Sequence, residues 1–118
     1  MEMLDSGKRD EFKTGAVRDV QGDKARPDLI SPFFLHRLGI WLAMGARKYG
    51  ERNWEKGIPS SRCYASLMRH LNQYARAERD EDHLAAAAFN LMALIHNECH
   101  LPNMADFPPV EEPQAKEK

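Results

Sequence analysis

The stretch DEDHLAAAAFN, residues 80–90, decides how this chain folds. Three carboxylates precede a histidine and four alanines, and carboxylates at a helix start complement the positive end of the helix dipole. The alanines carry little side-chain volume, so a second helix can approach closely. Apolar residues continue at intervals of four, three, four and four residues, which is a helical period. We therefore expect a helix from about residue 82 to 99, with a seam of Leu84, Ala88, Leu91, Ile95 and Cys99.

Two further helices are expected before this one. Ser31 is a typical N-cap and Pro32 suits the first helical position, while Gly50 is a typical stop, so a helix should span about 31–49. Ser60 or Ser61 should cap a second helix that runs to about residue 78, with an apolar face at helical spacing. A short acidic turn then joins it to the third helix, which predicts an antiparallel helix hairpin. The residues of that apolar face are Tyr64, Leu67, Met68, Leu71 and Tyr74.

The predicted fold class is therefore all-α, a small helical bundle with no strand. Residues 1–13 are expected to be a flexible N-terminus, 14–101 a single helical domain, and 102–118 a flexible, proline-rich charged tail. Within the domain, residues 14–32 contain glycines, prolines and scattered apolar residues, and we interpret them as an N-terminal loop that closes over a ligand. Apolar faces that three short helices cannot cover alone predict a homo-oligomer.

Composition limits the partners. Lys and Arg number 17 against 18 Asp and Glu, so no overall field attracts a nucleic acid polymer or an anionic membrane. The chain has no apolar run of membrane-spanning length and no signal-peptide pattern at its start. Cys63 and Cys99 lack a CxxC partner and are interpreted as reduced, buried residues. We expect a cytoplasmic protein.

The polar residues of the hairpin are candidates for a site. His83, Asn90 and Asn97 recur every seven residues beside the apolar seam, and a row of amides favours a pocket for a planar ligand such as a base. His70 has apolar neighbours on its own helix and, in an antiparallel hairpin, could face Asn90. The alternative is structural: a helix cap followed by hydrogen-bonded interior groups.

Two loops add candidates for nucleotide binding. Lys48, Tyr49, Asn53 and Trp54 combine cation, aromatic rings and an amide, which suits stacking on a base and pairing with its edge. Trp54 could equally anchor its loop in the core. Basic residues on the glycine-containing early loop are typical of a phosphate grip, and Arg69 on the second helix could join them. The basic residues of that loop are Arg18, Lys24 and Arg26.

Taken in order, four segments resemble the phage-encoded dATP/dGTP diphosphohydrolase N-terminal family, which is grouped with the MazG-like all-α nucleoside triphosphate pyrophosphohydrolases. They are TGAVRDVQGDKARPDLISP, GARKYGERNWEKGIPSSR, RHLNQY and DEDHLAAAAFNLMALIH, within residues 14–97. The resemblance implies a phage or prophage origin, which would place the protein in the host cytoplasm, and it makes residues 14–101 a nucleotide-binding domain. It further implies a helical, oligomeric protein that splits deoxypurine triphosphates into monophosphate and pyrophosphate with a divalent metal, Mg²⁺ or Mn²⁺. The chain departs from the MazG-like pattern in lacking EExxE and in having Ala86 where the second acidic motif would end.

Two functions follow from these expectations. As an enzyme, the chain would hold metal with Asp80 and Asp82, and Glu78 and Glu51 are the other carboxylates that could take part. His70 or His83 would orient water or the base. The alternative is a phage protein without turnover that sequesters a nucleotide or a nucleotide-derived signal, and the missing EExxE favours it. We rank the hydrolase slightly ahead.

Overall fold

The computed structural model describes residues 2–106, which divide into two units, one ending at Ile30 and the other beginning at Ser31. The first unit contains an antiparallel hairpin of β1 (Arg9–Glu11) and β2 (Val17–Asp19), with Asp10 opposite Arg18. Asp19 accepts a hydrogen bond from the Ser6 amide at 3.2 Å and lies 3.5 Å from the Lys24 ammonium. The prediction of a chain without strands was therefore wrong, because strands of three residues are too short to show an alternating pattern.

The helical unit begins as the sequence indicates. Helix α1 (Pro32–Tyr49) is capped by Ser31, whose hydroxyl accepts a hydrogen bond from the Phe34 amide at 3.3 Å. It ends at Gly50, which has a φ of 98°, a conformation that costs glycine little. A 3₁₀ turn, η2 (Asn53–Lys56), follows. Both ends of this helix confirm the prediction.

Helix α2 (Ser60–Ala75) is capped differently from the prediction. Its N-cap is Pro59, and neither serine caps it with its own side chain. Instead Asp106 accepts hydrogen bonds from the Ser61 amide and hydroxyl, each at 2.8 Å, after the short turn η3 (Pro102–Met104). Part of the expected tail thus packs on the domain, while the tail beyond residue 106 lies outside the described residues.

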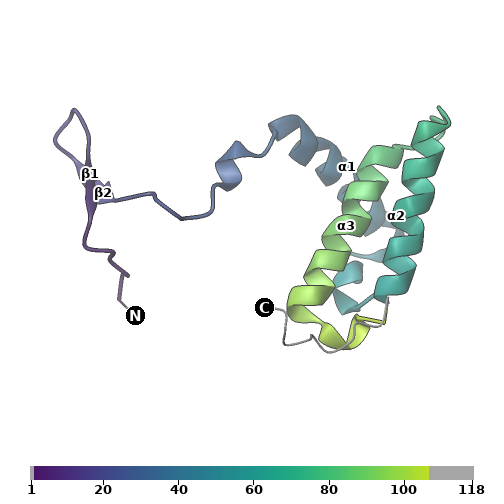
Figure 1. Cartoon of the computed structure of the whole chain (residues 1–118). Helices are drawn as coiled ribbons and strands as arrows, with labels where there is room; N and C mark the ends of the chain where they lie inside the picture. The colour runs from purple at the N-terminus through teal and green to yellow at the C-terminus, as the bar shows by residue number, and fades with distance from the viewer. Residues whose placement is uncertain (1, 107–118) are drawn as a thin grey trace, which may run out of the picture. The chain divides into compact units, whose positions relative to one another are not determined.

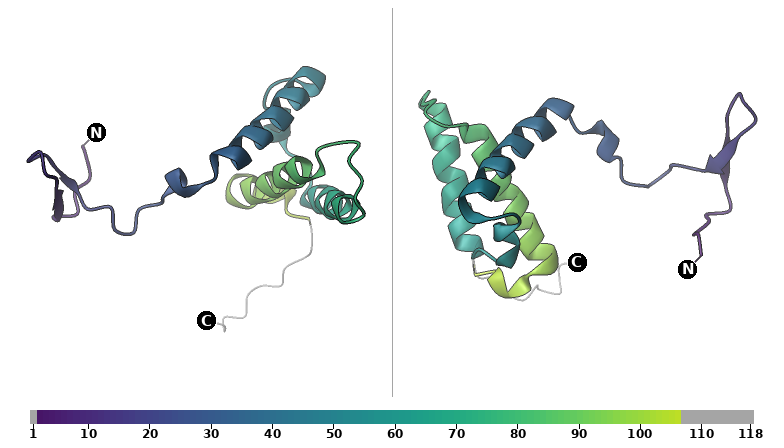
Figure 2. Two further views of the ribbon diagram at one scale, coloured as in Figure 1. Left: turned by 90° about the horizontal axis from the view of Figure 1, so that it is seen from above. Right: turned by 180° about the vertical axis from the view of Figure 1, so that it is seen from behind.

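Helix α3 (His83–His100) lies alongside α2 to form the expected helix hairpin (Figure 1), and α1 also packs against α3 (Figure 2). The stripe that α3 buries is not the expected seam. Leu91 and Ile95 are about half exposed, at 49% and 53%, and Cys99 is exposed too. The neighbouring stripe is buried because its alanines allow close approach and its polar side chains find partners there. It consists of His83, Ala86, Asn90, Ala93 and Asn97.

The polar members of the buried stripe are hydrogen-bonded, as buried polar groups must be. Asn97 donates to the carbonyl of Ile58 at 2.8 Å and to the hydroxyl of Ser60 at 3.1 Å. Asn90 donates to the carbonyl of Ala86 on its own helix at 2.9 Å. Asn97 therefore ties α3 to the start of α2, so its structural interpretation is sufficient.

Asp82 begins α3, and its carboxylate accepts a hydrogen bond from the Ala85 amide at 3.1 Å. We expect Asp82→Ala to lower the free energy of unfolding by about 1 kcal/mol, the usual cost of a lost N-cap. Asp82→Asn is the control, because asparagine caps equally well and loses only the exposed ion pair to Arg37, for an expected cost below about 0.5 kcal/mol. Urea unfolding measures both variants, and an equal loss in the two would show that the ion pair matters more than the cap.

Neither cysteine is in a disulfide: Cys63 is buried and Cys99 is exposed, so only one of the two buried positions was predicted correctly. Within residues 2–106, no helix has the length and apolar character needed to cross a membrane.

Candidate functional site

Three polar side chains, His70, His83 and Asp80, form a row of contacts where α2 meets the start of α3. The Nδ1 atoms of His70 and His83 are 2.9 Å apart, and His83 Nε2 lies 2.8 Å from Asp80 Oδ1. Both histidines are buried, at 5% and 2% exposure, whereas the Asp80 side chain is 68% exposed. Burial lowers the pKa of His70, and the hydrogen bond to His83 lowers the pKa of Asp80. The arrangement links a solvent-facing carboxylate to two interior imidazoles.

The contact between the histidines differs from the expected one, in which His70 faced Asn90. After α2 ends at Ala75, the chain folds back on it: the Glu78 amide donates to the Gln73 carbonyl at 3.0 Å, and Gln73 Nε2 donates to the Glu78 carboxylate at 3.1 Å. Helix α3 therefore starts level with His70, which places His83 opposite it.

Glu78, Asp80 and His83 can provide one ligand atom each to a metal ion, since the three atoms lie within 4.8 Å of one another. Two ligands at right angles around an ion, each about 2.1 Å from it, are about 3 Å apart, close to the 2.8 Å between His83 Nε2 and Asp80 Oδ1. The Glu78 carboxylate lies 2.7 Å from the Arg76 guanidinium and accepts a hydrogen bond from Gln73 Nε2 at 3.1 Å, so an ion would have to compete with these partners. The ligand types and the spacing of Asp80 and His83 fit a divalent ion, whose identity they leave open.

Asp82, the other expected metal ligand, has different partners. Its carboxylate receives hydrogen bonds from Arg37 of α1 at 2.5 and 3.0 Å, in addition to the cap at Ala85. The Arg37 guanidinium lowers the pKa of Asp82, so this carboxylate is ionised and already paired. It is not in the three-residue group that could hold an ion.

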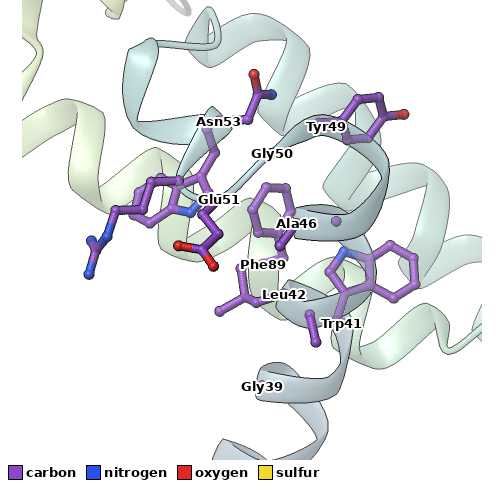
Figure 3. Close-up of a pocket in the computed structure, with 13 residues that line it drawn as sticks. Gly39, Trp41, Leu42, Ala46, Tyr49, Gly50, Glu51, Asn53 and Phe89 are labelled. Atoms are coloured by element: carbon purple, nitrogen blue, oxygen red, sulfur yellow. The ribbon is translucent and has the colours of Figure 1, made fainter.

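An aromatic pocket of about 450 Å³ lies between α1, the following loop and α3 (Figure 3). Trp41 and Tyr49 line it from α1, Asn53 and Trp54 from the η2 turn, and Phe89 from α3. Small residues of α1, among them Gly39 and Gly45, also line this pocket. Its size is within the usual range for small-molecule sites.

A second pocket of about 520 Å³ shares Trp41, Gly45 and Tyr49 with the first. Its remaining lining is polar at one side, where Lys48 and the acidic run 80–82 contribute. One wall thus separates an aromatic hollow from a charged one. The residues that line the two hollows lie within the helical unit.

A comparison with known families decides what this arrangement belongs to. Residues 14–106 match the family described as dATP/dGTP diphosphohydrolase, N-terminal. The chain belongs to this family. No curated protein and no solved structure matches it.

Within this diphosphohydrolase domain, the expected base-binding residues fall together. Tyr49, Asn53 and Trp54 line the aromatic pocket, and Lys48 lines the charged one. Trp54 also packs edge-on against His96, with ring centroids 4.9 Å apart, so it anchors its loop as well. Arg69 lies on α2, donates to Gln73 at 3.3 Å and does not line either pocket. Asn90 does not line them either, and its role in ligand binding stays a prediction.

The expected phosphate grip lies in the N-terminal unit of the diphosphohydrolase domain. Arg26 forms an ion pair with Asp28 at 2.8 Å and Lys24 one with Asp19 at 3.5 Å, so a phosphate would have to displace a carboxylate at either residue. Arg18 stands on β2, and no ion pair links it to another described residue.

We expect Arg18→Ala with Arg26→Ala to weaken nucleotide binding about tenfold, since a charge-assisted hydrogen bond contributes roughly 1.5–3 kcal/mol. Stability should change little because both residues are exposed. Calorimetric titration with dATP measures the effect, with Lys13→Ala as the control in the same unit. A double variant that binds as tightly as the parent would remove the phosphate grip.

Three residues of the site escaped the sequence analysis as functional candidates. Trp41 and Phe89 are in apolar helical patterns, where an aromatic side chain usually indicates core. Arg37 is 45 residues from its partner Asp82. Glu78 was a candidate metal ligand, although it was expected to end α2; the chain reversal after Ala75 brings it to Asp80.

Proposed function

We propose that this domain binds deoxypurine nucleoside triphosphates and hydrolyses them to the monophosphate and pyrophosphate with a divalent metal. The observation that carries the proposal is the shared wall between the aromatic and the charged pocket, formed by Trp41, Gly45 and Tyr49. Membership of the diphosphohydrolase family supports the substrate class.

The base would occupy the aromatic pocket. Trp41, Tyr49 and Phe89 offer ring surfaces for stacking, and the Asn53 amide can pair with a base edge through both its donor and its acceptor. Stacking of a base on an aromatic side chain contributes about 1–3 kcal/mol. The base would thereby point the triphosphate over the common wall.

The triphosphate would lie along the charged pocket. The Lys48 ammonium can bind a phosphate oxygen, but the carboxylates of residues 80–82 would repel the same group. This repulsion favours a cation between them, and Glu78, Asp80 and His83 are the residues that would hold it. When bound, a divalent ion neutralises phosphate charge and polarises phosphoryl oxygens.

The buried pair His70 and His83 would hold or transfer the proton. With one proton shared along the 2.9 Å contact, His70 and His83 can hold or pass a proton at their Nδ1 atoms in a site largely closed to water.

The test is incubation of the purified chain with dATP, dGTP and the pyrimidine triphosphates in Mg²⁺ or Mn²⁺, followed by separation of the products. Monophosphate and pyrophosphate from the purine substrates support the proposal. Binding without products would favour the alternative function, a nucleotide-sequestering protein, which the absence of EExxE also favours.

A variant pair tests the pocket itself. We expect Tyr49→Ala to weaken dATP binding about tenfold, because it removes a ring from the common wall. Phe33→Ala is the matched control, since this ring is on the same helix, is 81% exposed and lines neither of the two pockets. Equal affinities for the two variants in calorimetry would place the base elsewhere.

A further inference from the structure

The interior contact between His70 and His83 sets a constraint on protons. Two Nδ1 atoms at 2.9 Å form a hydrogen bond only when one carries a proton and the other does not. The His83 side chain is 0% exposed, so it cannot turn to water for another partner. Its Nε2 is directed at Asp80.

A metal ion on His83 Nε2 would fix this arrangement. The ring proton of His83 would then be on its Nδ1, which would donate a hydrogen bond to His70 Nδ1. Metal-bound histidines almost always donate their other ring N–H to a neighbouring acceptor, and loss of that acceptor usually costs 10–100-fold in metal affinity. His70 is placed to be this acceptor, and it contacts Trp41 edge-on, with ring centroids 6.1 Å apart, which holds its ring in place.

The ligand types point to a class of metal. Mg²⁺ prefers oxygen ligands and retains several waters. Imidazole nitrogen suits later first-row ions, whose affinity for mixed nitrogen and oxygen sites rises from Mn²⁺ through Co²⁺. Here one interior imidazole stands beside two carboxylates that reach solvent.

We propose that Glu78, Asp80 and His83 form a site that prefers a transition-metal ion, such as Co²⁺, Mn²⁺ or Zn²⁺, over Mg²⁺, and that His70 positions the ligand His83. The inference concerns the metal of the site in the proposed function, but it is tested without nucleotide and without turnover.

The experiment titrates the metal-free full chain with CoCl₂ and with MgCl₂ by calorimetry. We expect Co²⁺ to bind at least about tenfold more tightly than Mg²⁺. His83→Gln should remove this preference, while His36→Gln, on the exposed side of α1, should keep it. Equal affinities of the parent for the two ions would overturn the metal assignment.

His70 is tested by a conservative and a disruptive substitution. His70→Leu removes the acceptor and should weaken Co²⁺ binding 10–100-fold. His70→Asn retains an acceptor near the same position and should restore most of the affinity. If His70→Leu binds Co²⁺ as well as the parent, His70 does not position the ligand.

Two measurements guard against variants that fail to fold. On the parent chain, nitrogen-15 NMR with Zn²⁺ should shift His83 Nε2 and show a proton on its Nδ1; unchanged ring nitrogens at saturating Zn²⁺ would overturn the proposal. Glu78→Gln, at a partly exposed side chain, should weaken Co²⁺ binding while the His83 shift remains. A preference for Co²⁺ without any hydrolysis would refute only the proposed function, and hydrolysis with no preference for Co²⁺ would refute only this inference.

Discussion

We expect Asp80→Asn to reduce the metal-dependent hydrolysis of dATP at least about 100-fold, which is the usual effect of removing one electrostatic group from a reacting centre. Asp80 is the residue that belongs both to the possible metal group and to the lining of the charged pocket. It would therefore connect the ion to the phosphates. Its side chain is 68% exposed, so the substitution should leave the fold intact.

Product formation with dATP in Mn²⁺ measures the effect. Glu98→Gln is the control, because it neutralises an exposed carboxylate of α3 that is outside the metal group and both pockets. Nucleotide affinity without metal should persist in Asp80→Asn or even increase, since a negative charge near the phosphates is gone. Turnover at the parental rate would show that the acidic run serves only as a helix start.

Asp82 shows why the acidic run could not be interpreted from its composition. All three carboxylates at 80–82 suit a helix start, and the sequence also permits each to bind metal. In the structure, Asp82 caps α3 and forms an ion pair with Arg37, whereas Asp80 contacts His83. This division depends on where α1 passes, which local spacing does not encode.

The limits of α1 were predictable because local residues determine them. Ser31, Pro32 and Gly50 determine α1 through capping and backbone conformation within a few residues. The buried face of α3 was not predictable in this way. Both stripes have helical spacing, and the more apolar stripe is the better candidate for burial when only the sequence is considered. The alanines of α3, and not its leucines, are buried at the contact with α2, because close packing of two helices needs small side chains. The polar residues between these alanines form hydrogen bonds to residues of α2.

The sequence likewise indicated only part of the candidate site. The sequence indicates base recognition by Tyr49, Asn53 and Trp54, and these three residues line one pocket, while their binding of a base stays a prediction. The pairing of His70 with His83 was not predicted, because it depends on the chain reversal after Ala75, where Ala77 has a φ of 66°. A left-handed alanine gives no sequence pattern.

The stripe that α3 does not bury leads to the last prediction. Leu91 and Ile95 are half exposed on it, and towards its N-terminal end Leu84 and Ala88 line an apolar groove with Phe33 and others of α1. Exposed apolar side chains gathered on one helix face are typical of an interface. We expect the chain to form a homo-oligomer through this stripe.

Leu91→Glu combined with Ile95→Glu should raise the dissociation constant of the oligomer at least about 100-fold. Burial of each such side chain contributes about 1.5–3 kcal/mol, and a two-fold axis would use each of them twice. Sedimentation at micromolar concentration should show the parent as a dimer or larger and the double variant as a monomer. Met3→Glu, at a 94% exposed residue of the N-terminal unit, is the control.

Helix α2 also exposes apolar side chains, Met68 at 47% and Leu71 at 42%. If Met68→Glu with Leu71→Glu dissociates the oligomer and the α3 variant does not, the interface is on α2; a monomeric parent would contradict the oligomer altogether.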